Sequence, residues 1–199
     1  MSAAPAGRIG PNAIVQVTGA LRDQIGPEAA AQLVRAVGLG SYLDAPPRHM
    51  VDEREVISLH RAVREFLGVK SARNVARLAG HRTAEYLLAH RIPRLAQCVL
   101  RILPAWLASR LLLTAVVRHA WTFAGSGRFG ARQGHPVVVS IQDCPICRGM
   151  ASPAPVCDYY AATFERLFRQ LVHPACRVVE SECQAAGAPH CRFEIRWRN

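Results

Sequence analysis

The side chains best suited to chemistry in this 199-residue chain are cysteines gathered in its last third. Six of the seven cysteines fall between Cys144 and Cys191, and Glu180 stands three residues before Cys183. Thiolates and a carboxylate at such spacing are the ligands that a tetrahedral zinc ion takes in proteins. The pattern predicts a metal site but does not by itself indicate a function.

The sharpest part of this pattern is Glu180-x-x-Cys183-x7-Cys191. Residues 184–190 contain Gly187 and Pro189 and are flanked by alternating apolar and charged residues, which predicts a hairpin loop between two strands. The hairpin would place the two cysteines side by side, and Glu180 could add an oxygen ligand if its strand kinks.

The fourth ligand must come from elsewhere, and the residues leave two sources open. One is Cys157, which precedes a predicted helix, and the other is the Cys144-Pro-Ile-Cys147 pair. Cys98 and Cys176 are expected to be inert thiols, since free cysteine is a common core residue.

Periodicity and glycine or proline breaks predict helices in the first half of the chain and strands around one helix near its end, an α+β order. The predicted helices are 11–40 with a break at Pro27, 51–66, 71–90 and 159–171. The predicted strands are 137–141, 177–180 and 192–197.

The stretch from Leu95 to Phe123 is strongly apolar, but arginines interrupt it at 101, 110 and 118. No run of about 20 uncharged apolar residues survives, so a membrane-spanning helix is not expected. A pair of buried helices is the favoured interpretation, and a helix lying on a membrane surface is the alternative.

The net charge of +11 comes from the middle of the chain, where thirteen basic residues face two acidic ones between His60 and His135. No recognisable nucleic-acid-binding module accompanies this charge, so nucleic acid is not an expected partner. Met1 to Gly10 lacks the apolar core of a signal peptide, and an odd cysteine count favours a reducing compartment. We therefore expect a cytoplasmic protein.

Gly125-Ser-Gly127-Arg-Phe-Gly130 matches the dinucleotide fingerprint in letters only. The fingerprint requires a preceding strand and a following helix, whereas a helical segment precedes this one and no convincing helix follows. We interpret it as a turn leading toward the strand at 137–141.

The segment from Glu180 to Phe193, with Cys157 upstream, resembles the signature of the 4-vinyl reductase domain family, which includes sensor domains of aromatic-responsive transcription activators. Their zinc is held by a cysteine followed by Glu-x-x-Cys-x7-Cys. The resemblance implies zinc ligands Cys157, Glu180, Cys183 and Cys191, with Cys144 and Cys147 as alternates. Four protein ligands leave no open position, which implies a structural zinc.

The resemblance also implies a fold, the α+β fold shared with subunits of vesicle-tethering complexes. N-terminal helices would pack on a small antiparallel sheet with a zinc-clamped C-terminal hairpin. An N-terminal helical region would span residues 1–50 and the family domain 51–199, forming one compact unit with its zinc-binding part at 137–197. Homodimers are common in the family, and a homodimer is expected here.

Over its whole length the chain resembles the family branch called bacteriochlorophyll 4-vinyl reductases. Reduction needs a hydride donor, and the sequence shows no credible nicotinamide or flavin site. We therefore expect a tetrapyrrole-binding accessory or carrier protein of bacteriochlorophyll biosynthesis. It would bind Mg-porphyrin or divinyl protochlorophyllide and assist 8-vinyl (4-vinyl) reduction beside other enzymes of the pathway. A reductase in its own right and a ligand-sensing regulatory domain are the alternatives.

No catalytic residue can be named from the sequence, but a tetrapyrrole site has recognisable needs. A histidine could ligate the magnesium, aromatic rings could line a flat pocket, and an arginine could pair with the propionate. The candidates are His81, His119, Trp121, Phe123 and Arg118. Such a protein could also make peripheral contact with the inner photosynthetic membrane.

Overall fold

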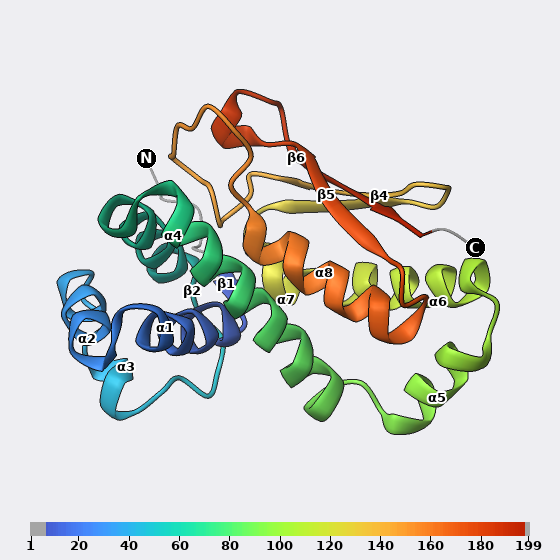
Figure 1. Ribbon diagram of the computed structural model, residues 1–199, viewed down its shortest axis with the longest axis horizontal. Helices are drawn as coiled ribbons and strands as arrows, with labels where there is room; N and C mark the ends of the chain where they lie inside the picture. The colour runs from blue at the N-terminus through green and yellow to red at the C-terminus, as the bar shows by residue number, and fades with distance from the viewer. Residues whose placement is uncertain (1–6, 198–199) are drawn as a thin grey trace.

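The computed structural model describes residues 7–197, in which a helical layer leads into a four-stranded antiparallel sheet (Figure 1). This α+β order is the one that the sequence predicts. The helices are α1 (Asn12–Ile25), α2 (Pro27–Ala36), α3 (Ser41–Asp44), α4 (Glu53–His90), α5 (Arg94–Ile102), α6 (Ala105–Arg118), α7 (Trp121–Ala124) and α8 (Asp158–Leu171), with a 3-10 turn η1 at Gln184–Ala186. The strands are β1 (Arg8–Ile9), β2 (Val51–Asp52), β3 (Arg128–Arg132), β4 (Val137–Gln142), β5 (Arg177–Glu182) and β6 (Cys191–Arg196).

The helical layer follows the predicted breaks closely. Gly26, with φ of 84°, separates α1 from α2. The predicted helices 51–66 and 71–90 form the single element α4, which is interrupted at Gly68, where φ is 69°. That backbone conformation is open to glycine at little steric cost, so one residue bends the helix without ending it. Asp52 caps α4 by accepting a hydrogen bond from the Arg54 amide at 2.8 Å.

The sheet has the order β3-β4-β6-β5, and one of its faces packs on α8. Val139 pairs with Phe193, and Ile141 pairs with Cys191, so alternate residues of β4 and β6 point to the same face. These side chains are fully buried. The predicted strand at 137–141 and the predicted hairpin between β5 and β6 are confirmed.

Helix α8 is the centre of the molecule, since it lies between the sheet and α4. A side-chain carbon at Gly80 of α4 would lie 2.3 Å from the Tyr159 carbonyl oxygen, so only glycine permits this close helix contact. The Tyr159 hydroxyl meets the Thr83 hydroxyl at 2.9 Å across the same contact. The metal-binding half and the helical layer therefore share one continuous core.

The expectation of a buried pair of helices over 95–123 is wrong for α5. Only Gln97 and Leu100 of this helix are buried, while Leu95 is 77% and Ile102 82% exposed. Trp106 of α6 is also largely exposed. None of the helices among residues 7–197 is both long and apolar enough to cross a membrane.

The glycine-rich segment at 125–130 forms a turn, as expected, and does not precede a helix. It follows the short helix α7 and runs into β3, a strand that the sequence did not reveal. Gly127 lies so close to the Gln142 carbonyl oxygen that a side-chain carbon would approach to 2.7 Å. The glycine therefore serves backbone packing at the end of the β3–β4 pair.

Candidate metal centre and an open cleft

Three chain segments bring five buried cysteines together. Cys144 and Cys147 lie on the loop that follows β4, and Cys157 is the residue that precedes α8. Cys183 follows β5, and Cys191 begins β6. The sulfur-bearing side chains are at most 1% exposed. The remaining cysteines of the described residues, Cys98 and Cys176, do not belong to either group of candidate metal ligands.

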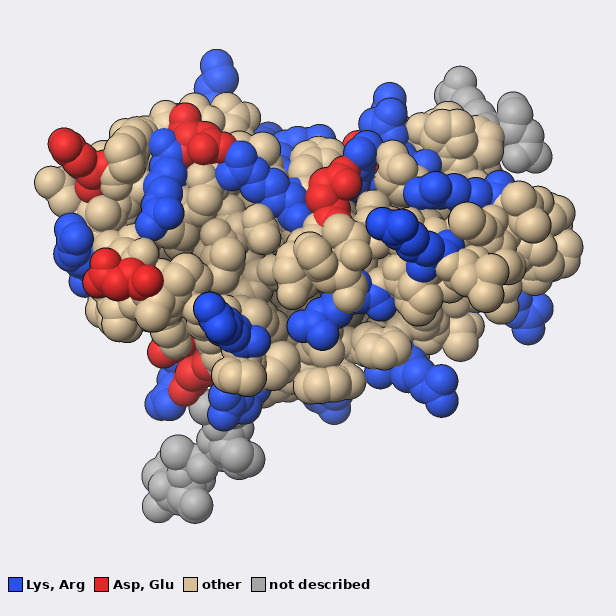
Figure 2. Space-filling view, turned by 90° about the horizontal axis from the view of Figure 1, so that it is seen from below, with Lys and Arg blue, Asp and Glu red and all other residues tan. Residues whose placement is uncertain are grey.

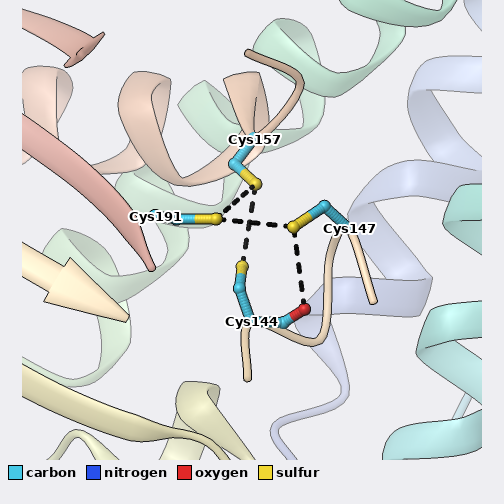
Figure 3. Close-up of side chains that lie close together, drawn as sticks. All are labelled: Cys144, Cys147, Cys157 and Cys191. Atoms are coloured by element: carbon cyan, nitrogen blue, oxygen red, sulfur yellow. Dashed lines mark hydrogen bonds between the residues drawn. The ribbon is translucent and has the colours of Figure 1, made fainter. Parts of the chain in front are cut away.

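Four of these sulfurs converge on one point (Figure 3). The Cys157 sulfur lies 3.6 Å from those of Cys144 and Cys191, and the Cys147 sulfur lies 3.4 Å from that of Cys191. Four sulfurs bound at about 2.3 Å to a tetrahedral zinc ion would stand about 3.8 Å apart. The spacing far exceeds a disulfide bond and matches the edges of a single-ion tetrahedron.

A second group of four donors overlaps the first and comprises Cys157, Glu180, Cys183 and Cys191. This is the set that the family resemblance implies. The pairing of β5 with β6 shifts register between Glu180 and Glu182, which is the strand irregularity that the predicted glutamate ligand needs. The Cys183 and Cys191 sulfurs lie 3.9 Å apart.

The orientation of Glu180 fits a bound cation. Its Oε2 accepts a hydrogen bond from the Cys157 amide at 2.7 Å, while its Oε1 is buried without any hydrogen-bond partner. An unpartnered buried carboxylate oxygen is costly unless a cation or a proton joins it. In the metal-free chain, burial and the neighbouring Cys183 raise the pKa of Glu180 to about 9.

The surroundings also suit thiolates once an ion is present. Cys157 lies at the N-terminal end of α8, where the helix dipole favours negative charge. The Gln184 amide donates a hydrogen bond to the Cys191 sulfur at 3.4 Å. Burial raises the pKa of the Cys144 and Cys157 thiols, so without metal both are neutral. Metal binding would therefore release protons.

Helix α4 fastens the loop that carries the first cysteines. The Arg64 guanidinium donates to the Val156 carbonyl oxygen at 2.6 Å, and Arg61 donates to that of Arg148 at 3.3 Å. Arg73 pairs with Asp158 at 3.2 Å. These arginines belong to the basic segment of the chain, and they hold the ligand loop.

A buried ion pair joins the same loop to the glycine turn. Arg148 donates to the Glu53 carboxylate at 2.9 Å, and Ser126 donates to it through its amide at 2.8 Å and its hydroxyl at 2.6 Å. Burial alone would raise the pKa of Glu53, but the Ser126 and Arg148 hydrogen bonds together hold it below its usual value. The Ser126 amide at the centre of the apparent dinucleotide fingerprint thus already binds a carboxylate.

A second feature is an open cleft of about 970 Å³ between the start of α6, the β3–β4 turn and the end of β6. Trp106 and Trp197 contribute flat aromatic surface, and the His135 ring lies edge-on to Trp197 with centroids 5.0 Å apart. Arg110 supplies a positive charge. Ser109 also lines the cleft, and its buried hydroxyl has no hydrogen-bond partner.

The structure does not bring the five candidate tetrapyrrole residues into one pocket. His81 lies on α4 beside α8, where burial and Arg77 lower its pKa. Phe123 packs in the aromatic core against Phe129 and Phe164. His119, Trp121 and Arg118 lie exposed around the end of α6. None of the five lines the cleft, and their assignment stays a prediction.

The cleft residues carried weak sequence signals. Trp106 and Arg110 belong to the apolar, arginine-interrupted stretch that drew attention for another reason. His135 and Trp197 are distant in sequence, and only the pairing of β4 with β6 places the β3–β4 turn beside the end of β6. The pattern Gly134-His135-Pro136, a turn with a histidine, was the one local hint.

The fold and the cysteine centre define a protein with a 4-vinyl reductase domain, because the family model of that domain matches residues 137–197. The Bacteriochlorophyll synthase 23 kDa chain of Cereibacter sphaeroides is 45% identical over 188 residues, covering 94% of this chain and 90% of the relative. The protein of that name from Rhodobacter capsulatus is 39% identical, covering 94% and 86%. The chain belongs to the family of these bacteriochlorophyll synthase 23 kDa chains, which confirms the resemblance.

Solved structures with a similar fold are H-NOX proteins. An H-NOX protein from K. algicida has a TM-score of 0.59 at 10% identity, covering 96% of this chain and 97% of the other. One from S. oneidensis has a TM-score of 0.53 at 14% identity, covering 96% and 100%. At such identities the likeness concerns the fold alone. The kinship with vesicle-tethering subunits stays a prediction.

Proposed function

We propose that this chain is a tetrapyrrole-binding accessory or carrier protein of bacteriochlorophyll biosynthesis, which presents Mg-porphyrin or divinyl protochlorophyllide for 8-vinyl reduction. Two relatives that match nearly the whole chain are named as chains of bacteriochlorophyll synthase, which supports a role beside other enzymes of the pathway. The single observation that carries the binding role is the cleft beside α6.

The lining of the cleft matches the chemistry of a magnesium tetrapyrrole. Trp106 and Trp197 offer aromatic surface to a flat macrocycle, and the Arg110 guanidinium can pair with a carboxylate side chain. The His135 imidazole can serve as a ligand to magnesium. A volume of about 970 Å³ lies at the upper end of the range for small-molecule sites.

The metal centre has a structural role in this proposal. Either group of four donors would saturate a tetrahedral ion, which leaves no position for water or substrate. Zinc suits these soft, redox-inert sites, and it would clamp the β5–β6 hairpin to the start of α8. Pigment binding would then take place in a half of the molecule that the metal holds in shape.

The surface next to the cleft favours contact with an anionic membrane. Leu95, Val99 and Ile102 form one exposed apolar stripe on α5, and Trp106 extends it to the cleft. The chain has seven arginines and no acidic residue between Glu85 and Asp143. In Figure 2 the right-hand part of the face, where α5 lies, shows blue and tan without red. Arginines and exposed tryptophan suit lipid headgroups.

The runner-up function is direct reduction of the 8-vinyl group by this chain. It would need a hydride donor, and the Ser126 amide of the glycine turn already binds Glu53. A ligand-sensing regulatory domain is the second alternative, since a buried metal clamp and a pigment cleft also suit a sensor. The expected homodimer would compete with the membrane for the α5 surface.

A pigment titration tests the binding site. Divinyl protochlorophyllide is added to the purified chain, and its absorption shift and the tryptophan fluorescence are followed. His135→Ala and Arg110→Glu should each weaken binding at least about tenfold, equal to about 1.4 kcal/mol. The matched controls are His49→Ala and Arg48→Glu on the exposed α3–β2 loop. Equal affinity in cleft and control variants would refute the site.

A further inference from the structure

The metal centre contains more donors than one ion can use. Five thiols and the Glu180 carboxylate fall into two groups of four, and the groups share only Cys157 and Cys191. An ion in the first group would leave Glu180 Oε1 and Cys183 buried without a metal. An ion in the second group would leave the Cys144 and Cys147 thiols in the same condition.

We propose that the centre holds two divalent metal ions, bridged by the thiolates of Cys157 and Cys191. One ion would take Cys144 and Cys147 as its terminal ligands, and the other would take Glu180 and Cys183. The bridging sulfurs lie 3.6 Å apart, which is close to the edge of about 3.8 Å that two zinc tetrahedra would share. Zinc is the ion expected, since thiolate ligands select it.

Charge favours the second ion as much as the first. Four anionic donors around one divalent ion leave two net negative charges, and six donors around two divalent ions leave the same two. The second ion replaces two protons, which pass from the remaining thiols or the carboxyl group to solvent. The buried charge is therefore unchanged, while the unpartnered Oε1 of Glu180 gains a ligand role.

The positions of the ligands support two distinct ion sites. Cys144 and Cys147 lie on a turn in which the Cys147 amide donates to the Cys144 carbonyl oxygen at 3.3 Å, and the first sulfur approaches Cys157 while the second approaches Cys191. Cys183 approaches Cys191 at 3.9 Å from the β5–β6 hairpin. The loop and the hairpin thus reach the two shared sulfurs independently.

Metal counting on the full chain tests this inference. The chain purified with zinc present should contain two zinc ions by elemental analysis, and Cys144→Ser/Cys147→Ser or Glu180→Gln/Cys183→Ser should each reduce the content to one. Cys176→Ala, which removes a buried thiol outside both groups, should keep two. One ion in the wild-type chain overturns the two-ion centre alone, and no ion also overturns the structural metal proposed above.

Cobalt replacement keeps the test decisive if a double variant does not fold. The metal-free wild-type chain should take up two equivalents of Co²⁺ with strong sulfur-to-cobalt absorption. Bridging thiolates should couple the two ions magnetically, so the magnetic moment per cobalt should fall as the second equivalent binds. Saturation at one equivalent, or two uncoupled ions, contradicts the bridged pair.

Discussion

The metal centre and the α5–α6 surface differ in how completely their side chains are partnered. The five clustered cysteines are at most 1% exposed, and α4 and the glycine turn fasten their loop. On α5, Leu95 and Ile102 lie open to solvent beside a cleft with an unpartnered Ser109 hydroxyl. The region rich in reactive residue types is closed, and the region of ordinary residues is open. Binding function is therefore expected in the second region, and stability in the first.

The largest effect should come from removing a shared ligand. Cys157→Ser or Cys191→Ser should release the metal and lower the free energy of unfolding by at least about 5 kcal/mol, since folding and metal binding are coupled. Urea unfolding and elemental analysis measure both quantities. Cys176→Ala is the buried control and should cost about 1 kcal/mol with the metal retained. A stable, metal-loaded Cys157→Ser chain contradicts the closed centre.

The buried ion pair should come next. Arg148→Met leaves the Glu53 carboxylate buried without its guanidinium, which should cost about 3 kcal/mol of unfolding free energy. Adding Glu53→Gln removes the stranded charge, so the double variant should be more stable than Arg148→Met alone. Additive losses in this double-mutant cycle would show that the pair does not act as a unit.

The closed region should also depend on pH through His60. Burial, aided by Arg64, lowers the pKa of His60 from 6.5 to about 4. The unfolded chain therefore binds this proton near pH 6.5, whereas the folded chain does not. The contribution is complete above about pH 6.5 and should fall by about 2 kcal/mol by pH 5. His60→Gln should lose this part of the pH dependence, and His49→Gln should keep it.

The smallest effect on stability should come from the open region. Leu95→Ser/Ile102→Ser should change the free energy of unfolding by less than about 0.5 kcal/mol, because both side chains are exposed. The same variant should lose flotation with vesicles of anionic lipid. Val179→Ser, at another exposed apolar residue on β5, should still float. A wild-type dimer that does not float, and that the α5 variant dissociates, would assign this surface to a second copy.

The elements with strong local signals could be predicted from the sequence. Pro27, Gly38 and the β-branched run from Val137 marked boundaries that the structure confirms within a few residues. The predicted Glu180 kink depended on ligand spacing, and the β5–β6 register shift supplies it. Strand β3 was missed because its residues, Arg-Phe-Gly-Ala-Arg, show little strand character without β4 beside them.

Tertiary placement explains what the sequence could not give. The α5 stripe has the periodicity of a buried helix, and periodicity alone does not say whether the apolar side faces protein or solvent. Cys144 and Cys147 gave a recognisable pair, but only the folded loop shows their sulfurs beside Cys157 and Cys191. The cleft joins α6 to two distant turns, so no local pattern could reveal it.

The most direct test of the central claim is a single-turnover measurement on the pigment complex. The purified chain is loaded with divinyl protochlorophyllide, NADPH or reduced ferredoxin is added, and the absorption spectrum and extracted pigment are followed. A carrier should bind the pigment through the cleft and return it with its 8-vinyl group intact. Conversion to the monovinyl product by this chain alone would contradict the account.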